Sequence, residues 1–176
     1  MATALVTGAT AGIGESFTRL LAQQGYDLVL VARDVKRLAE RAKFLRGKYK
    51  VKVEIIVADL SKNNEIAKVS KRLTNPKNPV EVLINNAGFG LKKSFLTSKS
   101  KDERALLDVL VTAPMTLSHA VLPFMKARNS GRIINVSSVA SWIAGGTYSA
   151  AKSYVTVFSE SLHSELRGTN IKVTAL

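Results

Sequence analysis

The stretch TGATAGIG at residues 7–14 decides the fold of this chain. It follows the strand-like run TALVT and leads directly into a segment with helical spacing of apolar residues at 13–24. Gly8 allows a tight turn, Gly12 lets the backbone approach a pyrophosphate, and Gly14 permits close packing of the helix. The N-terminus of that helix adds free N–H donors and a positive dipole end. This arrangement favours a dinucleotide-binding turn between a first strand and a first helix.

Strand-like runs rich in β-branched residues alternate with helical patterns along the chain. Continuous apolar strands separated by helices are typical of a parallel sheet that is covered on both faces. The sequence therefore predicts an α/β fold, a Rossmann-type doubly wound parallel sheet with helices on both faces, which binds ligands at the carboxyl ends of its strands. The predicted strands are 3–7, 27–32, 52–58, 80–85, 131–136 and 170–176, and the predicted helices are 13–24, 35–48, 62–73, 102–127 and 147–167.

The size and composition of the chain predict one globule, a single dinucleotide-binding domain over residues 1–176. The chain is 46% hydrophobic, which is enough to fill a core without staples. It has no cysteine and only two histidines, so no metal site is predicted. The N-terminus has no charged leader, and no apolar run in the sequence is expected to reach the length of a bilayer span. A cytoplasmic protein without membrane contact is expected.

The formal net charge of +13 invites a nucleic-acid interpretation, which we do not favour. The basic residues are spread over the helical segments rather than confined to one stripe, and few aromatic residues are placed to stack on bases. A positive surface also attracts anionic small molecules, and a polyphosphate cofactor is one of these.

The residues after the second and third strands bear on which dinucleotide would bind. Arg33 stands at the end of the second strand, where a 2′-phosphate needs a cation, so NADP(H) is preferred over NAD. An arginine exposed to solvent is the alternative, and the neighbouring Asp34 weakens the inference. Lys36 and Arg37 could assist or could be solvated helix residues. Asp59 could accept from the adenine amino group, or serve as a turn or helix-capping residue.

Tyr148 and Lys152 lie four residues apart in GTYSAAKSYV, where side chains of a helix share a face. Alone, they would be interpreted as a surface pair. However, TGATAGIG, NNAG at 85–88, NVSS at 135–138 and YSAAK at 148–152 occur in order and at the boundaries of elements. Together they closely resemble the short-chain dehydrogenase/reductase family, and the resemblance runs from Ala4 to Leu176.

The resemblance implies catalytic roles for three residues. Tyr148 would give or take the proton at the substrate oxygen, and Lys152 would bind the nicotinamide ribose and assist the tyrosine. A neighbouring cation stabilises a phenolate, which agrees with this assignment. Ser138 would orient the substrate oxygen. Ser137 is the weaker candidate, because a strand alternates its faces and only one of the two serines should point into the cleft.

The resemblance also implies a set of cofactor contacts. The NNAG segment would lie along the adenosine side, where Asn86 and Ala87 would offer backbone contacts and Gly88 would allow close approach. Without the other motifs, these residues would be interpreted as an ordinary turn after a strand. The predicted cofactor-binding residues are Gly8, Thr10, Gly12, Ile13, Gly14, Arg33, Asp59, Asn86, Ala87, Gly88, Tyr148 and Lys152.

The sequence departs from the family pattern in three places. Leu110 occupies the position where the family commonly has an asparagine that supports a proton relay, so we expect reduced but not absent activity. Alternatively, Leu110 simply extends an apolar face. Trp142 and Ile143 lie in a short loop, where they could line the substrate cleft or pack inward. The sequence ends in the sixth strand, so the C-terminal lid and seventh strand of the family are expected to be absent.

The leading hypothesis is an NADP(H)-dependent oxidoreductase that transfers a hydride between nicotinamide and a carbonyl or secondary alcohol substrate. The alternative is a non-catalytic NADP-binding protein of the same family. The resemblance also implies a homodimer or homotetramer. Apolar positions on the last helix could form the partner face or could pack on the sheet; they are Ala151, Val155, Phe158, Leu162 and Leu166.

Overall fold

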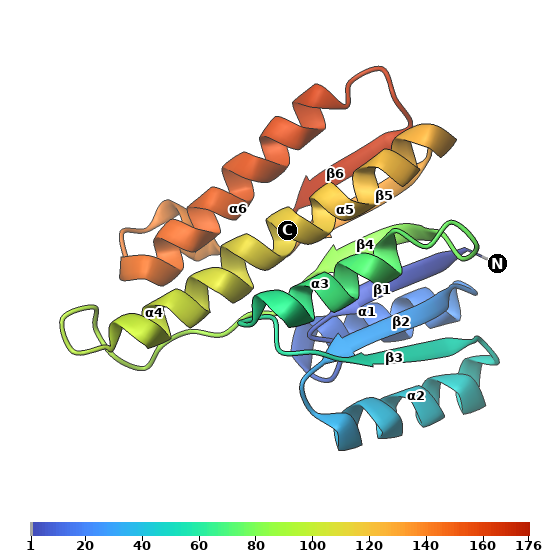
Figure 1. The fold of residues 1–176 in the computed structure, drawn as a ribbon, viewed down its shortest axis with the longest axis horizontal. Helices are drawn as coiled ribbons and strands as arrows, with labels where there is room; N and C mark the ends of the chain where they lie inside the picture. The colour runs from blue at the N-terminus through green and yellow to red at the C-terminus, as the bar shows by residue number, and fades with distance from the viewer. Residues whose placement is uncertain (1) are drawn as a thin grey trace.

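The computed structural model describes residues 2–176 and contains a parallel six-stranded sheet in the order β3-β2-β1-β4-β5-β6 (Figure 1). The order reverses between β1 and β4, because the chain first winds outward to β3 and then crosses back. This confirms the predicted doubly wound sheet. The strands are β1 (Thr3–Thr7), β2 (Asp27–Ala32), β3 (Val53–Val57), β4 (Val80–Asn85), β5 (Gly131–Asn135) and β6 (Ile171–Ala175).

Helices cover both faces of the sheet, as Figure 1 shows. On one face lie α1 (Gly12–Gln23) and α2 (Val35–Tyr49). On the other lie α3 (Asn63–Leu73), α5 (Ala113–Arg128) and α6 (Gly146–Glu165). Each face therefore has a core layer of its own.

The alternation of side chains along β1 explains the two layers. Leu5 points into the layer under α3 and α5, whereas Ala4 and Val6 point into the layer under α1 and α2. All three are fully buried, as is expected for a central strand covered on both faces. The carboxyl ends of the strands are thereby held rigidly at one edge of the sheet.

The predicted helix 102–127 is a longer, interrupted run in the structure. It consists of α4 (Ser100–Leu107), a π-helical turn at Asp108–Thr112 and then α5. A π-turn is rare and often marks a functional site. The apolar sequence does not predict this π-turn, because a π-turn differs from an α-helix only in that its backbone hydrogen bonds span one more residue.

The run Ser100–Arg128 is long and apolar enough to cross a membrane, so the expectation that no segment reaches that length is wrong. The core helix of a globular protein passes the same test. Much of its apolar side is already buried in this molecule, where Leu106, Leu110, Leu117 and Met125 lie in the core. Length and composition therefore carry little weight here.

Two open questions about apolar residues are answered by burial. Trp142, in a 3-10 turn at Val139–Trp142, is 79% exposed and Ile143 is 61% exposed, so neither packs inward. On α6, Ala151 and Val155 are buried within the chain, as is Leu166 just after the helix. Those three positions pack inside the molecule, whereas Phe158 and Leu162 are half-buried.

Candidate active site

A cleft of about 1150 Å³ lies at the carboxyl ends of the strands. This is where a doubly wound sheet is expected to bind its ligand. The cleft is lined by all but one of the residues predicted from the sequence: Gly8, Thr10, Gly12, Ile13, Arg33, Asp59, Asn86, Ala87, Gly88, Ser138, Tyr148 and Lys152. The exception is Gly14, which lies beneath the surface of the glycine turn.

The glycine turn leaves no room for side chains at its base. Gly8 has a φ of +66°, which favours glycine, and a Cβ at Gly14 would lie 2.2 Å from the carbonyl oxygen of Gly8. Gly14 thus lets α1 press against the turn, as predicted. At Gly12 no atom lies within 4 Å of a built Cβ, so the space in front of the helix is open. The first-turn N–H groups of α1 have no partner within the helix and face this side.

The NNAG segment holds the glycine turn through Thr7. The Thr7 hydroxyl accepts from the backbone N–H groups of Asn86 and Ala87, at 2.9 and 3.0 Å. The Asn86 side chain donates back to the carbonyls of Thr7 and Gly8, at 2.9 and 3.2 Å. The backbone N–H groups of Asn86 and Ala87 are therefore already engaged, so the predicted backbone contacts to a ligand are left to the carbonyls of these two residues. The sequence did not identify Thr7 as a residue of this site, because its partners Asn86 and Ala87 lie far away in the sequence and come close to it only in the folded chain.

The charged residues after β2 have separate tasks. Asp34 caps α2 by accepting from the Arg37 backbone N–H at 3.0 Å. Its carboxylate is thus engaged at the helix N-terminus, where it complements the dipole. Arg33, Asp34 and Arg37 are exposed and line the cleft, whereas Lys36 does not. Two guanidinium groups therefore stand at the end of β2.

Asp59 is a turn residue that also faces the cleft. Its carboxylate accepts from the Ser61 backbone N–H at 3.1 Å and from the Ser61 hydroxyl at 2.8 Å. Burial works to raise the pKa of Asp59, but the Ser61 hydrogen bonds and the charges of Arg33 and Lys62 outweigh it, so the pKa lies below its ordinary value. Asp59 is therefore held as a carboxylate near Arg33, and its own hydrogen bonds are those of a turn.

Tyr148 and Lys152 lie together on α6. The Lys152 ammonium is 5.7 Å from the centre of the Tyr148 ring and donates to the Val136 carbonyl at 2.6 Å. Lys152 is only 5% exposed, and burial lowers the pKa of its ammonium. Within residues 2–176 it forms no ion pair. A buried lysine without a counter-ion in a cleft is typical of a functional site rather than of a surface pair.

The two serines after β5 differ in what their hydroxyls do. Ser137 is buried and bonds to the Lys152 carbonyl at 3.1 Å and to the Thr156 hydroxyl at 2.7 Å. The Ser138 hydroxyl accepts from the Ala140 backbone N–H at 3.1 Å, which leaves its own proton free to donate. These contacts favour Ser138 over Ser137 as the hydroxyl available to a ligand.

Leu110 lies on the π-turn, 2% exposed, in a small apolar cluster with Leu106 and Ala151. Tyr148 packs against the same cluster. A Cβ at Gly88 would come within 3.0 Å of the Leu110 side chain. Leu110 therefore extends an apolar face, as the alternative interpretation proposed, and it supports the tyrosine by packing.

The remaining polar groups give no sign of metal chemistry in the described part of the chain. Across residues 2–176, no group of three or more His, Cys, Asp or Glu side chains is close enough to hold a metal ion. The chemical groups in the cleft include a phenol, an ammonium, the Ser138 hydroxyl, two guanidinium groups, the carboxylates of Asp34 and Asp59, and a helix N-terminus. Such a set can bind a phosphorylated molecule at one end and transfer a proton at the other.

Comparison with known proteins decides the family. The family model described as short chain dehydrogenase matches residues 2–176. The chain belongs to the short-chain dehydrogenase family. The resemblance carried by the four sequence motifs is thus confirmed over nearly the whole chain.

Relatives of this chain include an uncharacterized oxidoreductase of Staphylococcus saprophyticus. It is 32% identical over 176 residues, which cover 98% of this chain and 75% of the relative. An NADP-dependent 3-hydroxy acid dehydrogenase of Escherichia coli K12 is 35% identical over 174 residues, covering 97% of this chain and 68% of that protein.

Solved structures of other proteins have nearly the same fold as this chain. A short-chain dehydrogenase from Sphingobium yanoikuyae in complex with NADPH has a TM-score of 0.96 and 35% identity, and the match covers 99% of this chain and 69% of that one. The bulky-bulky ketone specific alcohol dehydrogenase from Comamonas testosteroni also has a TM-score of 0.96 and 35% identity, with 99% and 71% covered.

Proposed function

We propose that this chain is an NADP(H)-dependent oxidoreductase that transfers a hydride between nicotinamide and a carbonyl or secondary alcohol carbon. The observation that carries the proposal is the shared cleft, which joins the glycine turn of α1 to Tyr148, Lys152 and Ser138. NADPH in the Sphingobium yanoikuyae structure and the NADP-dependence of the Escherichia coli relative support it. Residues 1–176 would act as a single dinucleotide-binding domain in the cytoplasm.

The residues present fit a phosphorylated dinucleotide. The open space at Gly12 and the free N–H groups of the first turn of α1 suit a pyrophosphate. Arg33 and Arg37 suit a 2′-phosphate, and Asp34 is engaged in capping α2. This division of labour favours NADP(H) over NAD(H).

The catalytic end of the cleft suits proton transfer. A nicotinamide bound there would supply or accept the hydride. Tyr148 would give its phenolic proton to a substrate carbonyl oxygen, and Ser138 would donate a hydrogen bond to the same oxygen. The Lys152 ammonium would stabilise the resulting phenolate. Because the pKa of Lys152 is lowered, this help should fade as pH rises through it.

The walls beside Tyr148 suit an apolar substrate. A second hollow of about 410 Å³ shares Tyr148 and Leu91 with the main cleft. Phe95, Leu96 and Leu106 line it, together with the charged residues Lys93 and Glu103. The likeness to a bulky-bulky ketone specific alcohol dehydrogenase supports a carbonyl substrate with large substituents. We therefore expect carbonyl compounds with apolar substituents to be better substrates than small polar ones.

We also infer that the chain forms a homodimer or homotetramer through α4, α5 and α6. Leu107, Met115 and Val157 are exposed apolar residues on these helices, and α4 contacts α6. Light scattering should give a molar mass that is a multiple of 19.0 kDa, and Val157→Lys should lower that mass.

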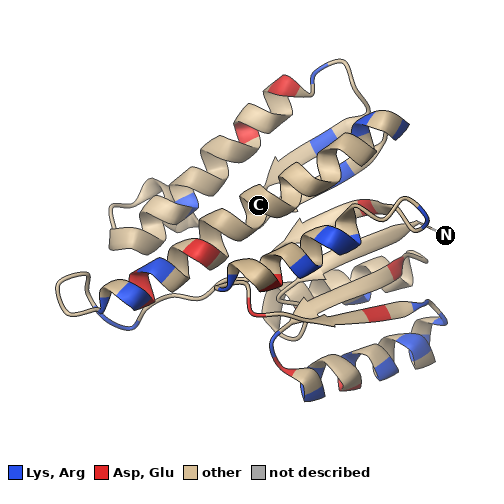
Figure 2. Cartoon of the chain, in the orientation of Figure 1, with Lys and Arg blue, Asp and Glu red and all other residues tan. Residues whose placement is uncertain are grey.

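Nucleic acid is not the favoured partner. Figure 2 shows Lys and Arg spread over several elements, including α2, α3 and α4, rather than gathered in one stripe.

The function is tested by titrating the purified chain with NADPH and NADH by fluorescence, followed by NADPH oxidation against aldehydes, ketones and diketones. Preferential NADPH binding, with turnover that Tyr148→Phe abolishes, would support the oxidoreductase. Binding without turnover would favour the non-catalytic NADP-binding alternative, for which Leu110 is the one specific observation. Failure to bind either nucleotide would overturn the cofactor assignment.

A further inference from the structure

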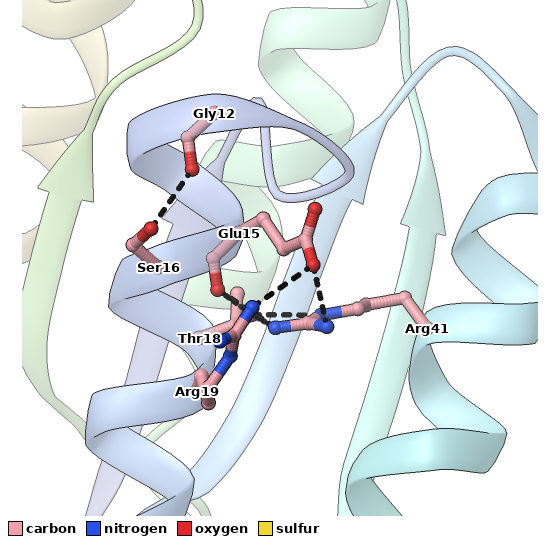
Figure 3. Close-up of polar contacts among 6 residues, drawn as sticks. All are labelled: Gly12, Glu15, Ser16, Thr18, Arg19 and Arg41. Atoms are coloured by element: carbon pink, nitrogen blue, oxygen red, sulfur yellow. Dashed lines mark hydrogen bonds and ion pairs between the residues drawn. The ribbon is translucent and has the colours of Figure 1, made fainter.

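Arg41 connects α2 to the first turns of α1, the helix that begins at the glycine turn (Figure 3). Its guanidinium donates to the Glu15 carboxylate at 2.9 Å and to the Glu15 backbone carbonyl at 2.8 Å. Two further bonds, at 3.0 and 3.1 Å, reach the Thr18 hydroxyl. The planar side chain of Arg41 thus binds two residues of α1, Glu15 and Thr18, which lie about one helical turn apart.

Glu15 has two basic partners, of which Arg41 is largely buried and Arg19 is exposed. The Arg41 side chain is 10% exposed, and burial lowers the pKa of its guanidinium while Glu15 opposes that effect. Arg19 approaches the same Glu15 oxygen from 3.4 Å but is 53% exposed. Arg41 is therefore the main partner of Glu15, because a solvated pair is screened and a buried, multiply bonded one is not.

Glu15 lies in a place where an unpaired negative charge would oppose an anionic ligand. It stands in the first turns of α1, three residues after Gly12, where the helix N-terminus favours anions. A carboxylate there competes with a bound phosphate for the same positive potential. Pairing with Arg41 removes most of that competition.

Arg41 also fixes the second nucleotide-binding segment. Arg37 lies one helical turn before Arg41 on α2, and residues four apart share a face of a helix. Arg37 lines the cleft. Anchoring Arg41 to α1 therefore sets the distance between the glycine turn and the guanidinium groups at the start of α2.

We propose that Arg41 is a positioning residue for the dinucleotide: it locks the phosphate-binding helix to α2 and neutralises Glu15, so that both segments meet the ligand together. The inference rests on the proposed function, because it concerns the affinity for NADP(H). Arg41 itself does not line the cleft. Its effect on binding therefore passes through Glu15 and the position of α2.

The test is a cycle of variants measured by NADPH titration at low and high salt, with the free energy of unfolding measured in parallel. Arg41→Met removes the charge and the planar fork, and Glu15→Gln removes the opposing charge. The double variant removes both. Arg41→Lys keeps the charge without the fork and serves if Arg41→Met fails to fold. Arg19→Met is the matched control, because Arg19 contacts the same carboxylate from an exposed position.

We expect Arg41→Met to weaken NADPH binding about tenfold, as for the loss of one charge interaction of about 1.4 kcal/mol. The loss should shrink at high salt, and adding Glu15→Gln should recover most of it. Arg41→Lys should weaken binding about threefold, and Arg19→Met should change it less than twofold.

A role limited to stability would leave a different pattern. If Arg41→Met lowers the free energy of unfolding but binds NADPH normally, or if Glu15→Gln fails to restore binding in the double variant, the positioning role is wrong. If Arg41→Met does not fold and Arg41→Lys binds NADPH normally, it is also wrong. Absence of NADPH binding by the unchanged chain would instead overturn the proposed function, and this inference with it.

Discussion

At the α1–α2 end of the cleft, the buried guanidinium of Arg41 faces the Glu15 carboxylate, whereas at the α6 end the buried ammonium of Lys152 faces only a carbonyl. Burial lowers the pKa of both groups, but the Glu15 carboxylate opposes this effect at Arg41, whereas burial is the one cause at Lys152. The first arrangement suits a rigid binding surface. The second suits chemistry, since a charge that its surroundings do not satisfy is available to stabilise a phenolate. The two ends of one cleft thus use burial for different purposes.

The largest effect should come from Tyr148→Phe, which breaks the catalytic end alone. Loss of the proton donor should lower kcat about a thousandfold while NADPH binding and folding are kept. Steady-state kinetics and a fluorescence titration check both. Tyr154→Phe is the control, because Tyr154 lies on the same helix, stacks on Phe158 and does not line the cleft. Equal kcat values for the two variants would contradict the assignment of Tyr148.

Gly14→Ala should break the binding end by sterics. Its Cβ would meet the Gly8 carbonyl oxygen at 2.2 Å, so we expect the free energy of unfolding to fall by about 3 kcal/mol. Denaturant unfolding measures this loss. Gly47→Ala is the matched control, because no atom lies within 4 Å there and the position is helical. That variant should gain about 0.5 to 1 kcal/mol, and a similar loss in both would mean that the turn is not tightly packed.

Arg33→Ala should sharpen the distinction between cofactors. We expect NADPH affinity to fall about tenfold and NADH affinity to change less than twofold, since only NADPH carries the 2′-phosphate. Parallel titrations with both nucleotides test this. Lys36→Ala is the control, as Lys36 is exposed but does not line the cleft. Equal losses for NADPH and NADH would place Arg33 elsewhere on the nucleotide.

Lys152→Met should have the smallest effect on stability, opposite in sign to that of Gly14→Ala. Removing a buried charge that has no counter-ion should raise the free energy of unfolding at pH 7, although turnover is lost. At pH values between the lowered pKa of Lys152 and its ordinary pKa of about 10.4, the unfolded chain binds more protons than the folded chain. The wild type therefore gains stability as pH rises through this range. The gap between the variant and the wild type should therefore narrow with pH. If this difference in unfolding free energy grows as pH rises, Lys152 is not destabilised by burial of its charge.

The sequence predicted the local features of this molecule well. The alternation of elements, the turn at Gly8 and Gly14 and the pairing of Tyr148 with Lys152 all depend on residues near one another in the chain. Placement of the motifs then followed from one rule, that parallel strands end at the same edge of a sheet.

Features that depend on distant residues were out of reach. The Thr7 hydroxyl meets Asn86, 79 positions away, and Arg41 meets Glu15, 26 positions away. The π-turn at Leu110 lies against Gly88 and α6, and the apolar residues of the turn do not by themselves distinguish it from an α-helix. Trp142 could not be placed either, because a loop leaves no periodic pattern to show which side faces water.

The most direct test of the oxidoreductase assignment follows the hydride itself. The purified chain is incubated with NADPH carrying deuterium at the transferable position and with an apolar ketone, and the alcohol product is analysed by mass spectrometry. The proposed function predicts an alcohol one mass unit heavier from the wild type, formed about a thousandfold more slowly by Tyr148→Phe. An absence of deuterated alcohol across the carbonyl panel, with NADPH bound tightly, would contradict the catalytic assignment.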